Sequence, residues 1–342
     1  MERVLRVFLD SMGDGDFLRF QNALSRTMYH ELASGYRGDE DEVALVSRLV
    51  DCTKGKSYGP LKIDAAKIHG TRSYVDFDHL DEHVTKELGD MVLISAVTDG
   101  ATRLVQKVCI IQNKKGRESA PKKGPNTRWD IDLEQLFLLK NFPPLSGGRG
   151  ILRNWREVAF RNATGALGAY ALLASPGEMT FALAPIVADL LGGRKSLARA
   201  DMSLLQSNDV SQSSCPFFGI DSWLPHRMIL GHRYVHLMIK PSHRYDLPSP
   251  AARASGFPFL GRCRYCRDIF EFARNWTQFN IGEPCVISGA IVDRPLDDFS
   301  GFLLRSAGLG GDVAFGGGEQ VTAMPFPGHM AVFLLTMDVS GG

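Results

Sequence analysis

Apolar residues recur at helical spacing in the first part of the chain. Within residues 16–36, the positions that share one side of the predicted helix are Phe17, Phe20, Leu24, Met28 and Leu32. Gly35 would end that helix, and residues 39–53 carry a second helical pattern. We expect the first helix to dock its apolar side on a sheet.

Strand patterns follow the two helices. Polar and apolar residues alternate over residues 74–77, which predicts a short strand. The stretch GDMVLISAVTDGATRLVQKVCIIQNKKG, residues 89–116, predicts two long apolar strands that turn back at Asp99-Gly100. A basic loop comes next. Residues 129–142 then predict a helix, which the two prolines after it would end.

The composition shifts at PPLSGGRG, residues 143–150, which makes this stretch the best candidate for a linker. A helical pattern lies further on, over residues 263–279. Three other stretches have strand patterns: residues 233–239, 283–292 and 328–339. We therefore expect an α/β domain over residues 1–145 and an α+β part over residues 146–342 that recognises a partner, substrate or trigger.

Charge and hydropathy narrow the class of protein. Hydrophobic residues make up 44%, charged residues 23%, and the formal net charge is +1. These values are ordinary for a globular protein, so any nucleic-acid surface must be local. No apolar run of membrane-spanning length occurs, and the first residues lack a signal-peptide pattern. We expect a cytoplasmic protein without a membrane partner, and its scattered cysteines indicate reduced thiols.

An acid opens the first strand of the hairpin, and polar residues close the second. Gln112 and Lys114 are two residues apart and so share a face of the sheet. A strict two-residue turn would pair Asp90 with Cys109 and turn it to the other face, whereas a three-residue loop or a bulge at Gly100 brings it to the same face. Carboxylate and amide oxygens can hold Mg²⁺, and a lysine can stabilise charge on a phosphate. The hairpin therefore predicts a phosphodiester-hydrolysing site.

The segments GDMVLI and CIIQNKK resemble the motif of the restriction-endonuclease-like, PD-(D/E)XK, nuclease superfamily. There an acid begins one core strand and an acid-x-Lys signature lies on the next, with Gln replacing the second acid in some branches. The resemblance implies an α/β, restriction-endonuclease-like core with a mixed sheet flanked by helices. It also implies a metal-dependent endonuclease, with Asp90, Gln112 and Lys114 as catalytic residues, in a setting such as bacterial antiviral defence against foreign DNA.

Members of the superfamily often add a glutamate from the helix before the sheet. Glu31 is our candidate for a catalytic and metal-binding residue of this kind, and Glu87 is its competitor. With Asp90 and Gln112, Glu31 would hold Mg²⁺ or Mn²⁺. Gln135 on the following helix could face the site. The basic residues expected to contact DNA phosphates are Lys115, Arg117, Lys122 and Lys123; the alternative for them is a charged loop that only aids solubility.

Two other functions stay open. A catalytically inactive nuclease fold could bind nucleic acid or protein as a subunit of a larger complex, and Gln112 in place of an acid favours it. Alternatively, the apolar segment over residues 165–191 could bury a partner or oligomer surface in an assembly subunit.

Cysteine and histidine suggest two further metal sites. Cys263 and Cys266 form a single CxxC, and a structural Zn²⁺ would need more ligands, such as Cys285 or His243. We favour two packed thiols there. Four histidines crowd residues 226–243, and we favour structural roles for them over metal binding.

Overall fold

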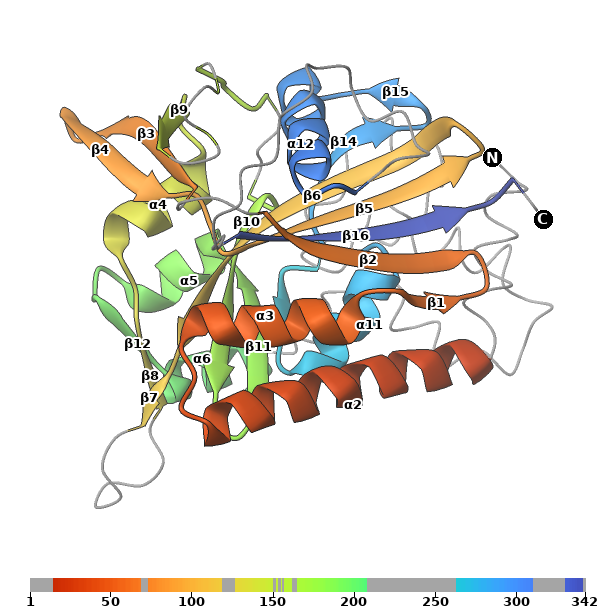
Figure 1. Ribbon diagram of the computed structural model, residues 1–342. Helices are drawn as coiled ribbons and strands as arrows, with labels where there is room; N and C mark the ends of the chain where they lie inside the picture. Colours follow the sequence, from red (N-terminus) through yellow and green to blue (C-terminus); the bar gives the residue numbers. More distant parts are fainter. Residues whose placement is uncertain are drawn as a thin grey trace.

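A large mixed sheet forms the centre of the protein (Figure 1). The structure is a computed structural model that describes residues 15–68, 73–118, 127–149, 152, 155, 157–161, 165–207, 263–309 and 330–340. The main path of this sheet, from edge to edge, is β1 (Lys56–Tyr58), β2 (Leu61–Ile68), β16 (Met330–Asp338), β5 (Met91–Asp99), β6 (Thr102–Lys115), β10 (Gly168–Ala174), β11 (Glu178–Leu183) and β13 (Tyr265–Cys266).

Shorter strands complete the described part. β14 (Glu283–Ile287) pairs with β6 and with β15 (Ala290–Ile291). Two small three-stranded sheets lie beside the main one. The first joins β12 (Ser196–Ala198), β8 (Thr127–Asp130) and β7 (Arg117–Glu118), and the second joins β4 (Glu82–Glu87), β3 (Tyr74–His79) and β9 (Ser146–Arg149).

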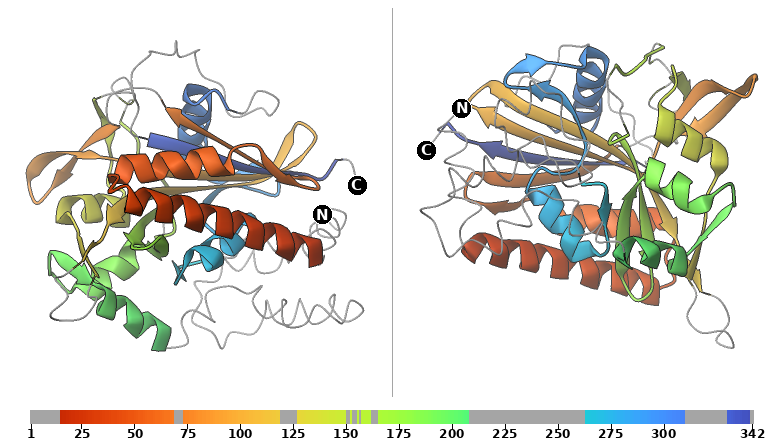
Figure 2. Two further views of the ribbon diagram at one scale, coloured as in Figure 1. Left: turned by 60° about the horizontal axis from the view of Figure 1, so that its bottom comes forward. Right: turned by 180° about the vertical axis from the view of Figure 1, so that it is seen from behind.

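Helices cover both faces of the main sheet (Figures 1 and 2). The helices of one face are α2 (Gly15–Arg37), α3 (Glu42–Thr53) and α11 (Ile269–Thr277). Those of the other are α4 (Leu133–Asn141), α5 (Ala184–Leu191) and α12 (Arg294–Ser306), while α6 (Arg199–Ser207) follows β12. The layering is that of an α/β protein.

Alternation along the central strands divides the core in two. In β5, Met91 and Leu93 pack with the helices α2, α3 and α11, whereas Val92 and Ile94 pack with α4 and α12. Successive strand residues point to opposite faces, so a strand covered on both sides is apolar at nearly every position. All positions of β5 except Asp99 are buried for this reason.

The predicted helices over residues 16–36 and 39–53 are confirmed as α2 and α3, but α2 continues through Gly35, which was expected to end it, as far as Arg37. Asp41 caps α3 by accepting the Ala44 N–H over 2.8 Å. The helix expected over residues 129–142 begins only at Leu133, because its first residues form β8 and Asp132 caps the helix. In the same way, the helix expected over residues 263–279 begins at Ile269.

The main sheet does not divide at the expected domain boundary. Strands from residues 1–145 and from residues 146–342 belong to the same sheet, and β16 lies between β2 and β5. The apolar segment over residues 165–191 forms β10, β11 and α5, which are buried in this sheet and on it rather than displayed as a partner surface. A boundary between residues 145 and 146 would therefore cut one core in two.

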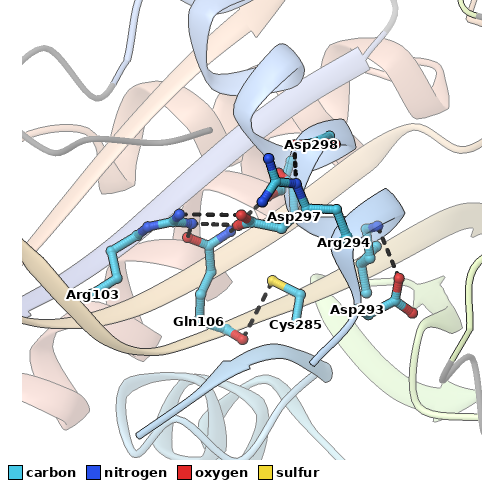
Figure 3. A network of polar contacts seen from close by, with 9 residues as sticks. Arg103, Gln106, Cys285, Asp293, Arg294, Asp297 and Asp298 are labelled. Carbon is cyan, nitrogen blue, oxygen red and sulfur yellow. Dashed lines mark hydrogen bonds and ion pairs between the residues drawn. The ribbon is translucent and has the colours of Figure 1, made fainter. Parts of the chain in front are cut away.

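A buried polar network fixes α12 on the sheet (Figure 3). The Arg103 guanidinium of β6 donates to both carboxylate oxygens of Asp297, whose side chain is only 1% exposed. Gln106 accepts from Arg103 over 2.8 Å and donates to Ser300 Oγ over 2.6 Å. These bonds compensate two charges that would be costly to bury alone.

Candidate active site

Two features set the register of the hairpin of β5 and β6: its loop and a bulge. Asp99 pairs with Thr102, which leaves a two-residue loop with Gly100 at a φ of 57°. The register then shifts, because Thr98 pairs with Arg103 but Val97 pairs with Val105. The skipped residue, Leu104, is a β-bulge, and it turns every later residue of β6 to the other face. Asp90 and Gln112 therefore lie on the same face of the sheet, as the proposed site requires. A bulge within β6 produces this arrangement, and the loop does not.

Asp90 lies at the end of the hairpin and is almost completely buried, at 5% exposure. Its Oδ2 accepts the side-chain N–H of Gln112 over 2.6 Å and the backbone N–H of Asn113 over 2.7 Å. The Asp90 carbonyl accepts the Ala331 N–H of β16 over 2.8 Å. The structure thus brings Asp90 and Gln112 into direct contact, and both of these side-chain bonds use one oxygen of the carboxylate.

A chain of amides continues from Gln112. Gln135, in the first turn of α4, donates from Nε2 to the Gln112 Oε1 and to the Glu87 carbonyl, the latter over 3.1 Å. α4 and β10 lie so close together at Gly168 that any side chain there would collide with the Leu139 carbonyl. We call the series Glu87 carbonyl, Gln135, Gln112 and Asp90 the amide relay.

The acids near Asp90 affect its pKa more strongly than Lys114 does. Burial and the negative charges of Glu87 and Glu42 raise its pKa to about 8, against the opposing effects of the Asn113 N–H and of Lys114. Glu42 begins α3, and its Oε1 accepts the Lys115 N–H over 2.6 Å. Such an excess of carboxylates is favourable for a cation and unfavourable without one.

Lys114 follows Gln112 by two residues, so its side chain leaves the same face of β6. It is half-buried and close enough to Asp90 to lower the pKa of that carboxyl. The arrangement therefore brings a carboxylate into contact with an amide where β5 begins and β6 ends, with Lys114 two residues further on along the same face of β6.

Glu31 does not join this group. It lies on α2, which covers the face of the sheet opposite α4, and its carboxylate accepts from Arg48 over 3.1 Å. Helix α2 does dock its apolar side on the sheet as expected, but Glu31 is turned toward α3. Glu87, the competing acid, is the first of the charged groups that raise the pKa of Asp90.

The basic residues of the proposed DNA surface are already engaged where they are described. Lys115 Nζ lies 2.9 Å from Asp39 Oδ1 and over the Tyr36 ring, on the α2 and α3 side of the sheet. Arg117 is exposed and lies 3.3 Å from Asp130 Oδ2. Lys122 and Lys123 lie outside the described residues.

Tyr170 is a residue of the site that sequence reasoning missed. It pairs with Gln112 across β6 and β10, so the two side chains share a face. Its hydroxyl is buried and makes no hydrogen bond within the described ranges. Burial, Asp132 and Asp90 raise the pKa of this phenol. No signal marked it, because β10 is apolar at its neighbouring positions.

The other metal ligands considered do not assemble in the described part. The sulfurs of Cys263 and Cys266 lie 3.1 Å apart, both buried, and Cys285 instead donates to the Gln106 carbonyl. His243 and the other crowded histidines lie outside the described residues. Among the residues that the structure describes, no group of three or more His, Cys, Asp or Glu residues could hold a metal ion.

In comparisons with known proteins, no family model, no curated protein and no solved structure matches this chain. Within the described ranges, no helix combines the length and apolar character that a membrane crossing needs.

Proposed function

We propose that the chain is a metal-dependent nuclease that hydrolyses phosphodiester bonds of DNA, with Asp90 and Lys114 as the main catalytic groups. The observation that carries the proposal is the buried Asp90 carboxylate at the start of β5, in contact with Gln112 and within the electrostatic reach of Lys114. Defence against foreign DNA is the biological setting that the resemblance suggests.

The residues fit a hard cation in part. Asp90 Oδ1 takes no part in the bonds from Gln112 and Asn113, and the acids Glu87 and Glu42 add negative charge nearby. Since Mg²⁺ often binds one or two carboxylates and completes its shell with water and substrate phosphate, Asp90 with one neighbouring acid would suffice. A bound cation would neutralise charge that develops on the phosphate and activate water for attack.

The roles of the chain's own groups follow from their positions. Asp90 would hold the cation through Oδ1, while Gln112 and the Asn113 N–H keep the carboxylate in place through Oδ2. Lys114 would place its ammonium group beside the phosphate, where negative charge increases in the transition state. Glu87, whose charge raises the pKa of Asp90, would take the role that was expected of Glu31.

The experiment is incubation of supercoiled plasmid DNA with the protein and Mg²⁺ or Mn²⁺, for wild type, Asp90→Asn and Lys114→Ala. Nicking or linearisation by wild type that needs the cation and is lost in both variants supports the proposal. Equal cleavage by wild type and Asp90→Asn would instead trace the activity to a contaminant or another site.

A second function is favoured by one observation. In the amide relay, Gln112 presents its N–H rather than its oxygen to Asp90, which weakens the site as a cation ligand set. A nuclease-like fold that binds nucleic acid without cleaving it would have this property. Retention of DNA by the protein without cleavage in Mg²⁺ or Mn²⁺ would select this second function.

A further inference from the structure

We propose that Gln135 is a positioning residue that limits the cation affinity of the Asp90 site. The inference rests on the proposed function and deepens it, because it names a residue that sets how strongly the site takes its metal. Gln135 acts through Gln112 and does not itself touch Asp90 in the relay.

A backbone group sets the direction in which the amides of the relay donate their hydrogen bonds. The Glu87 carbonyl can only accept a hydrogen bond, and it accepts from Gln135 Nε2 over 3.1 Å. The same NH₂ group donates its second hydrogen to Gln112 Oε1. Gln112 therefore has its oxygen turned to α4 and its NH₂ turned to Asp90, over 2.6 Å.

Neither glutamine can be reversed without loss. Reversal of Gln112 alone would place its NH₂ against the NH₂ of Gln135. Reversal of both would place the Gln135 oxygen against the Glu87 carbonyl. Gln112 is 3% exposed and Gln135 is 5% exposed, so water cannot readily compensate either mismatch. A buried donor or acceptor without a partner is unfavourable, and this holds the orientation of Gln112.

The orientation of the Gln112 amide affects how tightly the site would bind a cation. A metal ion at Asp90 would profit from the amide oxygen of Gln112, since amide oxygens are ligands for hard cations. The relay instead directs one hydrogen of the Gln112 NH₂ group to Asp90, while the same nitrogen lies 3.4 Å from the Asn113 carbonyl. Removing Gln135 releases Gln112 to present its oxygen, and the affinity for a divalent cation should increase roughly 5- to 100-fold, the range expected for one unpaired buried polar group.

The test is a titration with Mn²⁺ alone, in which the electron paramagnetic resonance signal of the unbound ion is measured. The main variant is Gln135→Met, which keeps the length of the side chain and removes the amide; Gln135→Leu serves if that protein does not fold. Asn141→Ala is the matched control, because Asn141 is an exposed amide of α4 that donates only to the Phe137 carbonyl of its own helix, over 3.0 Å. We expect tighter Mn²⁺ binding in Gln135→Met and wild-type affinity in Asn141→Ala.

A double-mutant cycle separates positioning from a general structural effect. If Gln135 acts through Gln112, then Gln135→Met should not change the Mn²⁺ affinity in a Gln112→Leu background. An equal effect in both backgrounds overturns the inference, and so does wild-type affinity in Gln135→Met. In these cases, cation-dependent cleavage that Asp90→Asn abolishes leaves the proposed function intact. If neither wild type nor Gln135→Met binds Mn²⁺ or cleaves DNA, both the inference and the metal-dependent nuclease are overturned.

Discussion

The Gln112 Nε2 lies 2.6 Å from the Asp90 Oδ2, and this hydrogen bond joins the start of β5 to the end of β6. The two residues are 22 apart in sequence and meet because a bulge at Leu104 corrects the parity of the hairpin. Because of this hydrogen bond, the charge and orientation of each side chain depend on the other.

Lys114→Ala should reduce DNA cleavage by on the order of 10²–10³, since removing one preorganised group that acts on transition-state charge has an effect of that size. Binding of DNA should change little, because the lysine acts mainly on charge absent from the ground state. Rates at saturating DNA and binding by fluorescence anisotropy check this. The control is Lys140→Ala, an exposed lysine at the end of α4. A comparable loss in the control would count against a specific role.

Gln112→Glu should increase Mn²⁺ affinity and preserve or raise the cleavage rate. The new carboxylate can still accept from Gln135, and it places a second negative charge beside Asp90. A carboxylate binds a hard cation better than an amide does. Without a cation the same variant should be less stable than wild type, because two buried carboxylates repel each other. Thermal unfolding with and without Mn²⁺ measures both effects, and an absence of Mn²⁺ stabilisation would contradict them.

The cation-free protein should lose stability as the pH rises from about 4 to about 8. Asp90 has a folded pKa of about 8, above the ordinary value of 3.8, so over this window the unfolded chain has released a proton that the folded chain keeps. The free energy of unfolding falls wherever the folded state binds more protons. Asp90→Asn should remove this component and raise stability at pH 8 by a few kcal/mol, since each pKa unit corresponds to ~1.4 kcal/mol. Urea unfolding at several pH values measures the slope; an unchanged slope in Asp90→Asn would refute the assignment.

Asp297→Ala should destabilise the protein by ~3–5 kcal/mol, because it leaves the Arg103 guanidinium buried opposite a missing charge. Replacement of both residues, in Arg103→Met with Asp297→Leu, should cost much less than the single change. Asp298→Ala is the control: it removes an exposed partner of Arg294 and should stay within ~1 kcal/mol of wild type. Urea denaturation gives all three values, and a double variant as unstable as the single one would contradict the argument.

Oxidation should join Cys263 to Cys266. Their sulfurs lie 3.1 Å apart, and a disulfide requires ~2.05 Å, so a small movement suffices. With diamide, the two thiols lose two hydrogens to the reagent and form one S–S bond. Mass spectrometry of the alkylated protein should show this bond, and Cys263→Ser should prevent it. Recovery of both cysteines in alkylated form after diamide treatment would disprove the pairing.

Local patterns in the sequence were sufficient for the helices α2 and α3 and for the hairpin of β5 and β6. The spacing of Phe17, Leu24 and Met28 predicts α2 because one helix face carries its own apolar signal. The same holds for the strands β5 and β6. The position of β16 in the sheet could not be predicted, since an apolar run shows that a strand is buried but not which strands it joins.

The candidate site was predicted in part for the same reason. Gln112 and Lys114 share a face because strand residues alternate with a period of two. The contact of Asp90 with Gln112 also needs the bulge at Leu104, which the sequence pattern did not place. Glu31 and Glu87 could not be distinguished, because the choice depends on which face of the sheet α2 covers. The orientation of the Gln112 amide depends on the Glu87 carbonyl, and no sequence pattern reports a backbone hydrogen bond across such a distance.

The position of β16 in the sheet also determines when the sheet can be completed during synthesis of the chain. This strand lies between β2 and β5, and its Ala331 N–H holds the carbonyl of Asp90. During synthesis on the ribosome, β2 and β5 emerge more than two hundred residues before β16. Until β16 is made, the strand edges that it will join have no partner, and strands with unpaired edges are prone to aggregate. The surroundings of Asp90 are therefore completed only after residues 330–338 have been made, and nascent chains shorter than this should carry an unfinished site.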